Sequence, residues 1–244
     1  MADHAADEPG AAGPGTHLTG DAEAAEAAAA LEAGRLLFAA ECRFVYAAQR
    51  LDQLPPMDGA EVAFAGRSNV GKSSLLNALT GRRALARVSV TPGRTRQLNF
   101  FDLDGRLTLV DMPGYGYARA SKDVKQDWQG LMFDYLRGRA TLRRVMLLLD
   151  SRVEVKAADR EVMDLLDRAA VTFQVVLTKA DGVKPAALER KQAEAAALVR
   201  AHPAAHPALL VTSSETGQGI AELRGAIAEL AIPAAMARAS SGSV

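Results

Sequence analysis

The residues with the clearest chemistry lie between positions 66 and 73. They fit the pattern G-x-x-x-x-G-K-[ST], which is typical of loops that bind phosphate. Glycine lets such a loop turn its N–H groups inward, toward phosphate oxygens. Lys72 would contact the β- and γ-phosphates, and the hydroxyl of Ser73 would ligate Mg²⁺. The sequence therefore predicts a nucleotide site that includes Gly66, Arg67, Ser68, Asn69, Val70, Gly71, Lys72 and Ser73.

A second motif follows an apolar stretch that we expect to be a strand. Asp111 would hold Mg²⁺ through its water shell, and the N–H of Gly114 would reach the γ-phosphate. Met112 and Pro113 lie between them and complete the predicted contact segment. GTP is expected to order the segment 114–125, and loss of the γ-phosphate would then release it.

A third motif, Thr178-Lys179-Ala180-Asp181, points to the base of the nucleotide. The carboxylate of Asp181 would accept two hydrogen bonds from the N–H edge of guanine, while Lys179 would lie along the ring. Adenine lacks those donors, so a buried Asp181 would be left unpaired with ATP. The polar segment Thr212, Ser213 and Ser214 is either a backbone donor to the guanine oxygen or an ordinary turn.

The elements that position these motifs alternate along the chain. Apolar stretches predict six strands, at residues 61–65, 97–102, 106–110, 144–149, 171–177 and 208–211. Helices are predicted between them, at 74–79, 123–137, 157–169, 185–201 and 219–230. This alternation predicts a mostly parallel α/β sheet with one antiparallel edge strand and helices on both faces. Each motif falls at the carboxyl end of a strand, where such sheets bind ligands.

Composition divides the chain into three parts. Residues 1–28 are rich in Ala and acidic residues, which predicts a disordered tail, although 22–30 could form a marginal helix. Residues 29–232 form the expected domain, and 233–244 the frayed end. From residue 28 onward there are 29 basic and 23 acidic residues, a balance that suits binding to a polyanion. A lone cysteine, Cys42, and the lack of a signal peptide or long apolar run favour a cytoplasmic protein without a membrane span.

The order of the motifs resembles that of the bacterial EngB (YihA/YsxC) family, a branch of the translation-factor-like P-loop GTPases. The resemblance runs from about residue 31 to 230, and its most distinctive segment is D-M-P-G-Y-G-Y at 111–117. It implies a Ras-like GTPase domain that binds GTP, GDP and Mg²⁺. It also implies a role in assembling the large ribosomal subunit and a need for the protein in normal septation. A monomer that contacts the subunit precursor is expected.

The resemblance assigns further contacts to the segment Gly93, Arg94, Thr95, Arg96 and Gln97. Thr95 would complete the coordination of Mg²⁺ beside Ser73; Thr91 is a less favoured alternative. Lys72, Thr95 and Gly114 are therefore the residues expected to act in hydrolysis. The reaction would be attack of water on the γ-phosphate, promoted by positioning and charge neutralisation.

Two positions differ from the commonest GTPase pattern. Thr178 replaces the usual Asn, which would remove a bond between the base loop and the phosphate loop and weaken nucleotide binding. Tyr115 replaces the Gln that orients water in Ras-like proteins, which predicts slow hydrolysis aided by a partner or an ion. Asn69 either helps to hold K⁺ or only supports the turn, and the sequence does not choose between these roles.

Basic side chains near the motifs suggest an rRNA surface, with Tyr115, Tyr117 or Trp128 available for stacking. They are Arg82, Arg83, Arg87, Arg94, Arg96, Arg119, Lys122 and Lys125, with a second group at Arg137, Arg139, Arg143 and Arg144. An ordinary solvated surface is the alternative. His202 and His206 have the spacing of two metal ligands, but nearby prolines and the lack of a third ligand favour a loop.

Three other functions remain open at this stage. The chain could bind GTP only as a structural ligand for an RNA- or protein-binding module. It could be an ATPase, which competition between ATP and labelled GDP would reveal. It could also act directly in septation.

Overall fold

The centre of the structure is a sheet whose main strands are buried on both faces. The computed structural model describes residues 17–82, 85, 97–116, 130, 132–235 and 237, with the backbone alone for 17–19. In these residues seven strands pair in the order β1-β3-β4-β2-β5-β6-β7. Their bounds are Cys42–Ala48 (β1), Glu61–Gly66 (β2), Leu98–Leu103 (β3), Leu107–Asp111 (β4), Leu142–Asp150 (β5), Phe173–Thr178 (β6) and Leu210–Val211 (β7).

The pairing confirms a mostly parallel sheet with antiparallel pairing at one edge. Strands β4, β2, β5, β6 and β7 run parallel, and β3 is antiparallel to both β4 and β1. The predicted number of strands, six, was wrong, because β1 adds a strand outside β3. Its sequence lacks the alternation of a half-buried strand, since Phe44, Val45 and Tyr46 are all exposed. Pairing with β3, rather than a sequence pattern, creates this strand.

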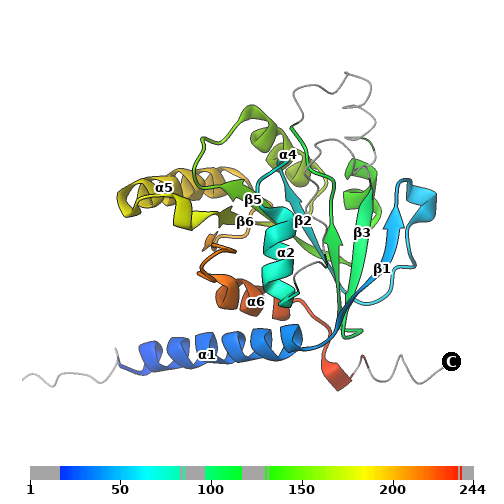
Figure 1. The fold of residues 1–244 in the computed structure, drawn as a ribbon, viewed down its shortest axis with the longest axis horizontal. Helices are drawn as coiled ribbons and strands as arrows, with labels where there is room; N and C mark the ends of the chain where they lie inside the picture. The colour runs from blue at the N-terminus through cyan, green and yellow to red at the C-terminus, as the bar shows by residue number, and fades with distance from the viewer. Residues whose placement is uncertain are drawn as a thin grey trace, which may run out of the picture.

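Helices cover both faces of the sheet (Figure 1). Helices α1 (His17–Ala39), α2 (Lys72–Thr80) and α6 (Ile220–Ala228) pack on one face. Helices α4 (Ala157–Arg168) and α5 (Pro185–Ala201), with the helical residues 132–138, pack on the other. Strand β2 shows how the chain serves both layers, because Val62 and Phe64 enter the first core while Ala63 and Ala65 enter the second.

The register of the sheet brings the expected site residues to one edge. Phe64 pairs with Asp111, Asp150 with Thr178, and Leu177 with Val211. All of these positions lie at or near the carboxyl ends of parallel strands, so the loops after β2, β4, β5, β6 and β7 meet there. Within the described residues, no helix has both the length and the apolar character needed to cross a membrane.

The two ends of the domain differ from the expected boundaries. Helix α1 begins at residue 17, inside the segment 1–28 expected to be a tail, and residues 20–29 are exposed or nearly so. The Ala and Glu residues of this exposed segment have high helix propensity, which favours the helix even where it does not pack on the domain. At the other end residues 234, 235 and 237 are helical, and Ala237 is buried. Residues 1–16 and 238–244 lie outside the described residues.

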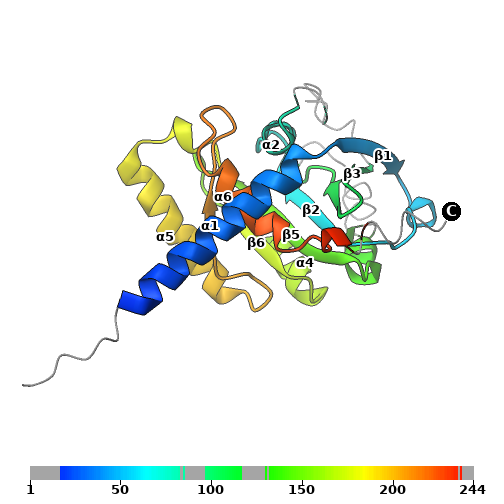
Figure 2. The same ribbon diagram turned by 90° about the horizontal axis from the view of Figure 1, so that it is seen from below.

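A close glycine contact anchors α1 on α6. Figure 2 shows α1 crossing α6 and extending beyond it. At the crossing, a Cβ added to Gly34 would lie 2.5 Å from the backbone nitrogen of Gly225 and 2.6 Å from the carbonyl carbon of Arg224. A Cβ added to Gly225 would lie 3.0 Å from the carbonyl oxygen of Ala30. The two backbones therefore touch where neither helix carries a side chain.

We predict opposite effects for two Gly→Ala changes in α1. Ala is the better helix former by about 1 kcal/mol, so Gly20→Ala, whose new Cβ meets nothing within 4 Å, should stabilise the protein. Gly34→Ala should destabilise it by about 1–3 kcal/mol despite the same gain, because its Cβ forces α1 off α6. Urea unfolding of both variants measures this. A Gly34→Ala protein as stable as the Gly20→Ala protein would contradict the contact.

Candidate nucleotide-binding site

The phosphate loop connects the end of β2 to the start of α2. Gly71 has φ +103°, a conformation that side chains rarely adopt, and α2 begins at the next residue, Lys72. A Cβ added to Gly66 would lie 2.7 Å from Cγ1 of Val70, so the loop also folds closely on itself. This glycine turn at a helix N-terminus has the form that binds anions, as the sequence predicted.

Lys72 and Asp111 face each other across this loop and form an ion pair. Their side chains are only 12% and 9% exposed, so solvent screens the pair weakly. The second carboxylate oxygen of Asp111 accepts a hydrogen bond of 3.4 Å from the amide of Asn99, which accepts one of 3.0 Å from Gln97. Sequence reasoning missed Asn99, because it is the register of the β3–β4 pair that places Asn99 opposite Asp111.

The donor atoms near the loop suit a hard divalent cation. Mg²⁺ takes oxygen ligands, and the site offers the carboxylate of Asp111 and the hydroxyl of Ser73 in the first turn of α2. The other expected protein ligand, Thr95, lies outside the described residues, as do Thr91, Gly93, Arg94 and Arg96; Asp111 is expected to act through a water molecule. Gln97 is described, and its side chain supports Asn99.

The segment after Asp111 lies directly against the phosphate loop. Tyr115 donates its N–H to the carbonyl of Gly66 at 3.2 Å and accepts the N–H of Ser68 at 3.1 Å. A Cβ added to Gly114 would lie 2.9 Å from Oγ of Ser68 and 3.2 Å from its Cα. The N–H of Met112 reaches the carbonyl of Phe64 at 3.1 Å, and Pro113 lies between the two contacts. A side chain at position 114 would therefore press against Ser68, and glycine avoids this.

The side chain of Tyr115 enters the core beneath α4 rather than facing the phosphate loop. It is 5% exposed, and its hydroxyl donates to Oδ1 of Asp159 at 2.9 Å. Burial, and then the charge of Asp159 and the hydrogen bond to it, hold the pKa of Tyr115 well above its usual value. The phenol therefore stays protonated. The suggestion that Tyr115 could stack on RNA was wrong, while Tyr117 and Trp128 lie outside the described residues.

Thr178 ties the base loop to the phosphate loop. Its hydroxyl lies 2.7 Å from the carbonyl oxygen of Val70 and 3.3 Å from that of Leu149. We expected that replacing Asn by Thr at this position would lose such a tie, and that expectation was wrong. A hydroxyl is enough, because strand β6 carries Thr178 close to the loop and only one donor is needed.

Lys179 makes a second connection between the two loops. Its ammonium group contacts the carbonyl oxygen of Asn69 and lies 3.0 Å from Oδ2 of Asp150. Burial would raise the pKa of Asp150, but hydrogen bonds from Arg152 and Lys179 outweigh it and lower that pKa to about 2. Asp150 is therefore charged at neutral pH and fixes the position of Lys179. The sequence analysis missed Asp150, which ends an apolar strand as Asp111 does.

The other residues expected to contact the base lie where the loop after β6 meets the loop after β7. Ser213 donates its hydroxyl to Oδ1 of Asp181, and the N–H of Ala180 reaches the carbonyl of Thr212 at 3.1 Å. Asp181 is exposed rather than buried, so the argument that ATP would leave a buried carboxylate unpaired does not hold in this form of the site. Its place at the rim still leaves its oxygens able to meet a base.

Of the backbone N–H groups of Thr212, Ser213 and Ser214, only that of Ser214 has no acceptor within the described residues. The N–H of Thr212 reaches the carbonyl of Leu177 at 2.7 Å, and that of Ser213 reaches Gln218 at 2.9 Å. Ser214 donates to nothing in the described part of the chain, so it is the one of the three able to serve a guanine oxygen.

Two of the proposed RNA-binding arginines serve the fold instead. Arg139 is 6% exposed; it pairs with the buried carboxylate of Glu61 at 2.6 Å and donates to the carbonyl oxygens of Pro55 and Pro56. Arg144 is half-buried and donates to Gln174 at 2.9 Å. Including Arg139 in the surface group was therefore wrong. Arg82, Arg137 and Arg143 remain exposed, and the other basic residues lie outside the described part.

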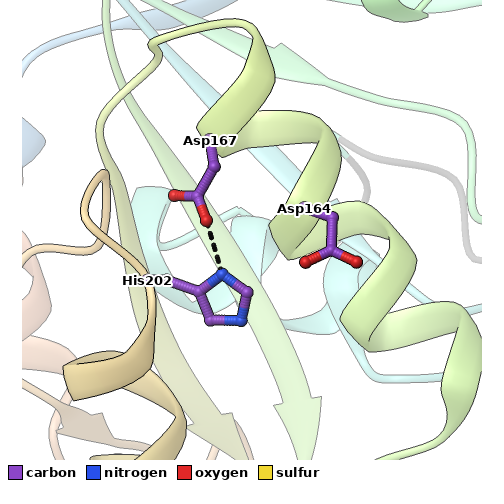
Figure 3. A group of neighbouring side chains, drawn as sticks. All are labelled: Asp164, Asp167 and His202. Atoms are coloured by element: carbon purple, nitrogen blue, oxygen red, sulfur yellow. Dashed lines mark hydrogen bonds and ion pairs between the residues drawn. The ribbon is translucent and has the colours of Figure 1, made fainter.

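Away from these loops, and within the described part of the chain, Asp164, Asp167 and His202 form a group with the atom spacing of a metal site (Figure 3). Asp167 is already used, because one oxygen lies 2.6 Å from Nδ1 of His202 and the other accepts the N–H of Ala204 at 3.0 Å. Two atoms 2.6 Å apart and hydrogen-bonded are poorly placed to share an ion. The group instead pins the loop after α5 to α4, which agrees with the loop predicted at His202 and His206.

Comparisons with known proteins agree with this geometry. Residues 61–179 match a family described as 50S ribosome-binding GTPase. A protein of Granulibacter bethesdensis named "Probable GTP-binding protein EngB" is 70% identical over 208 residues, covering 85% of this chain and 93% of the relative. A protein of the same name in Gluconobacter oxydans is 66% identical over 205 residues, covering 84% and 90%.

Two solved structures share the fold. A crystal structure of a probable GTP-binding protein engB aligns with a TM-score of 0.56 at 24% identity, covering 70% of this chain and 98% of that one. Era in complex with MgGDPNP and part of 16S ribosomal RNA aligns with a TM-score of 0.55 at 19% identity, covering 73% and 58%. The Ras-like P-loop GTPase fold is thereby confirmed.

We predict that Thr178→Val weakens GDP binding. The change leaves the carbonyl of Val70 without its partner, and an unmet buried group costs about 1–3 kcal/mol, or about five- to 150-fold in affinity. Thr80→Val is the matched control, because it removes a buried hydroxyl that donates to Leu76 at 2.8 Å at the far end of α2. Titration with a fluorescent GDP measures both. Binding by Thr178→Val within twofold of the parent would contradict the tie.

Proposed function

Since this chain belongs to the EngB family of GTP-binding proteins, we propose that it is a nucleotide-dependent switch in the assembly of the large ribosomal subunit. The chain is a GTPase that hydrolyses GTP to GDP and phosphate, and its matched domain is of the ribosome-binding type. We further propose that this GTPase acts during subunit assembly, that the subunit precursor is its partner, and that the residues named below bind and hydrolyse GTP. A need for the protein in septation follows from the same family and would be indirect, through the supply of ribosomes.

The proposed mechanism assigns the phosphates to the loop between β2 and α2. The ammonium of Lys72 has three N–H donors, so it can keep one for Asp111 and offer others to the β- and γ-phosphates. A bound Mg²⁺ would neutralise phosphate charge, held by Ser73 and Thr95 and by Asp111 through water. The N–H of Gly114 would contact the γ-phosphate from the opposite side.

The base is assigned to the loops after β6 and β7. Asp181 would accept from the N1 and N2 groups of guanine, the stem of Lys179 would cover the ring, and the N–H of Ser214 would reach the guanine oxygen. Ala180 and Thr212 hold these loops together through their backbone bond of 3.1 Å. Specificity for guanine then rests on the donors that the base presents to Asp181.

Slow intrinsic hydrolysis is proposed from the position of Tyr115. The residue at the place of the usual water-orienting Gln has its hydroxyl bonded to Asp159 in the core, 2.9 Å away. It has no amide and points away from the phosphate loop, so it cannot align a water molecule there. An ion or a partner on the ribosome is proposed to supply that function. The chain would act as a monomer in the cytoplasm.

Potassium is the ion that we propose for this role. Asn69 is exposed at the rim of the phosphate loop with φ +65°, and its backbone carbonyl is held by Lys179. The side-chain amide therefore stands clear of the contacts that shape the loop. An amide oxygen is a suitable ligand for a monovalent cation beside the β- and γ-phosphates.

We expect faster GTP turnover in KCl than in NaCl at equal ionic strength. Asn69→Gly should abolish the difference, because glycine accepts the positive φ and keeps the turn while removing the amide. Steady-state phosphate release measures the rates. Equal rates in the two salts would assign Asn69 to supporting the turn.

We also expect the protein to sediment with large-subunit precursors when bound to a non-hydrolysable GTP analogue and to dissociate with GDP.

Replacing the exposed Arg137 and Arg143 by Ala should weaken binding to the precursor and flatten the salt dependence of that binding, because phosphate contacts release counterions. The exposed pair Arg190 and Arg200 on α5, replaced likewise, controls for the charge change. Co-sedimentation that ignores the nucleotide would contradict the switch.

A further inference from the structure

We propose that Tyr115 is a positioning residue, whose bond to Asp159 holds Gly114 in place for recognition of the γ-phosphate. This inference rests on the proposed function, because it assumes that the N–H of Gly114 contacts that phosphate. Tyr115 stands where Ras-like proteins have a water-orienting Gln, and we assign it a different role. The side chain there is buried beneath α4, bonded to Asp159, and would act by fixing its neighbour.

The backbone around Gly114 is fixed on the side of the phosphate loop. Tyr115 and Arg67 form an isolated parallel bridge, in which Gly66 accepts from Tyr115 at 3.2 Å and Ser68 donates to it at 3.1 Å. Gly114 packs so closely on Ser68 that an added Cβ would lie 2.9 Å from its Oγ and 3.2 Å from its Cα. A shift of Tyr115 by even one ångström would therefore move Gly114 relative to the phosphate loop.

The side chain fixes the same residue on the side of α4. Asp159 is 2% exposed and uses both oxygens: Oδ1 accepts from Tyr115 at 2.9 Å and Oδ2 accepts the N–H of Lys156 at 2.9 Å. The second bond places the carboxylate in the first turn of α4, whose dipole stabilises negative charge there. A phenol bonded to a buried carboxylate is costly to displace, so α4 becomes the support of the γ-phosphate contact.

This arrangement places the start of the rearranging segment two residues later than the sequence predicted. We expected the rearranging segment to begin at Gly114, but Gly114 and Tyr115 are held from two sides. Gly116 has φ +81° and is exposed, so the chain leaves the anchored part there in a conformation that suits glycine. The segment that responds to GTP hydrolysis would begin at Gly116, with Gly114 preset for GTP.

The structure offers a matched control at the other end of the domain. Tyr135 is fully buried, and its hydroxyl donates to the buried carboxylate of Glu61 at 3.1 Å. Glu61 is the first residue of β2, whereas the phosphate loop follows its last residue, Gly66. Tyr115→Phe and Tyr135→Phe thus remove the same kind of bond, one beside the nucleotide site and one remote from it.

The experiment compares binding of GDP and of a non-hydrolysable GTP analogue, with Mg²⁺, in these two variants. Both should lose similar stability in urea unfolding and keep GDP affinity within about twofold. Tyr115→Phe alone should bind the GTP analogue about tenfold more weakly, and its single-turnover hydrolysis should fall. Asp159→Asn keeps an acceptor for the phenol, so its affinity for the GTP analogue should lie between those of the parent and Tyr115→Phe. In the double variant the two effects should not add, because both act on one bond.

The result that would overturn the inference is equal behaviour of Tyr115→Phe and Tyr135→Phe toward the GTP analogue. A loss of GDP affinity in Tyr115→Phe equal to its loss of analogue affinity would also overturn it, since that outcome indicates general loosening of the loop. Should Tyr115→Phe fail to fold, Asp159→Asn tests the same bond, and unchanged analogue affinity in that variant counts against the proposal. If the parent protein itself binds neither nucleotide, the proposed function fails instead.

Discussion

The phosphate loop is held on two opposite sides by hydrogen bonds to its main chain, and the rest of the site depends on this clamp. On one side Thr178 and Lys179, at the end of β6, reach the carbonyl oxygens of Val70 and Asn69. On the other side the backbone of Tyr115 bonds to Gly66 and Ser68. The loop that would hold the phosphates therefore connects the loop for the base to the segment for the γ-phosphate. A bound nucleotide would contact the site at its base and at its γ-phosphate, and the phosphate loop would connect these two contacts.

Buried charged groups extend this rigidity into the domain. Asp159 connects Tyr115 to the start of α4, and Asp150 connects Lys179 to the end of β5. At the remote end of β2, Glu61 accepts from Arg139, Tyr135 and Thr141, which joins the helix at 132–138 to the sheet. Asp159 and Glu61 are buried, and such carboxylates resist displacement because a broken bond leaves a charge unpaired in the interior.

The sequence predicted the motifs well because their spacing is a property of the chain. Glycines in the phosphate loop, Asp111 and Gly114 after a strand, and Thr178 to Asp181 after another could all be located, as could the parallel sheet that gathers them. It failed where partners decide the outcome. Strand β1 exists because β3 lies beside it, and Arg139 is buried because Glu61 is. Thr178 keeps its tie to the loop because β6 brings a hydroxyl within 2.7 Å of Val70.

The sequence by itself therefore determined the form of the site, a phosphate loop and a Thr-Lys-Ala-Asp loop at the carboxyl edge of an α/β sheet. Residue types and local periodicity carry that information. Only the tertiary structure decided which way Tyr115 points, that Asp181 lies at the rim, and that Asp150, Asp159 and Asn99 support the site. Those outcomes depend on distances between elements far apart in the chain. No local pattern records them, because a side chain takes its direction from the neighbours that packing provides.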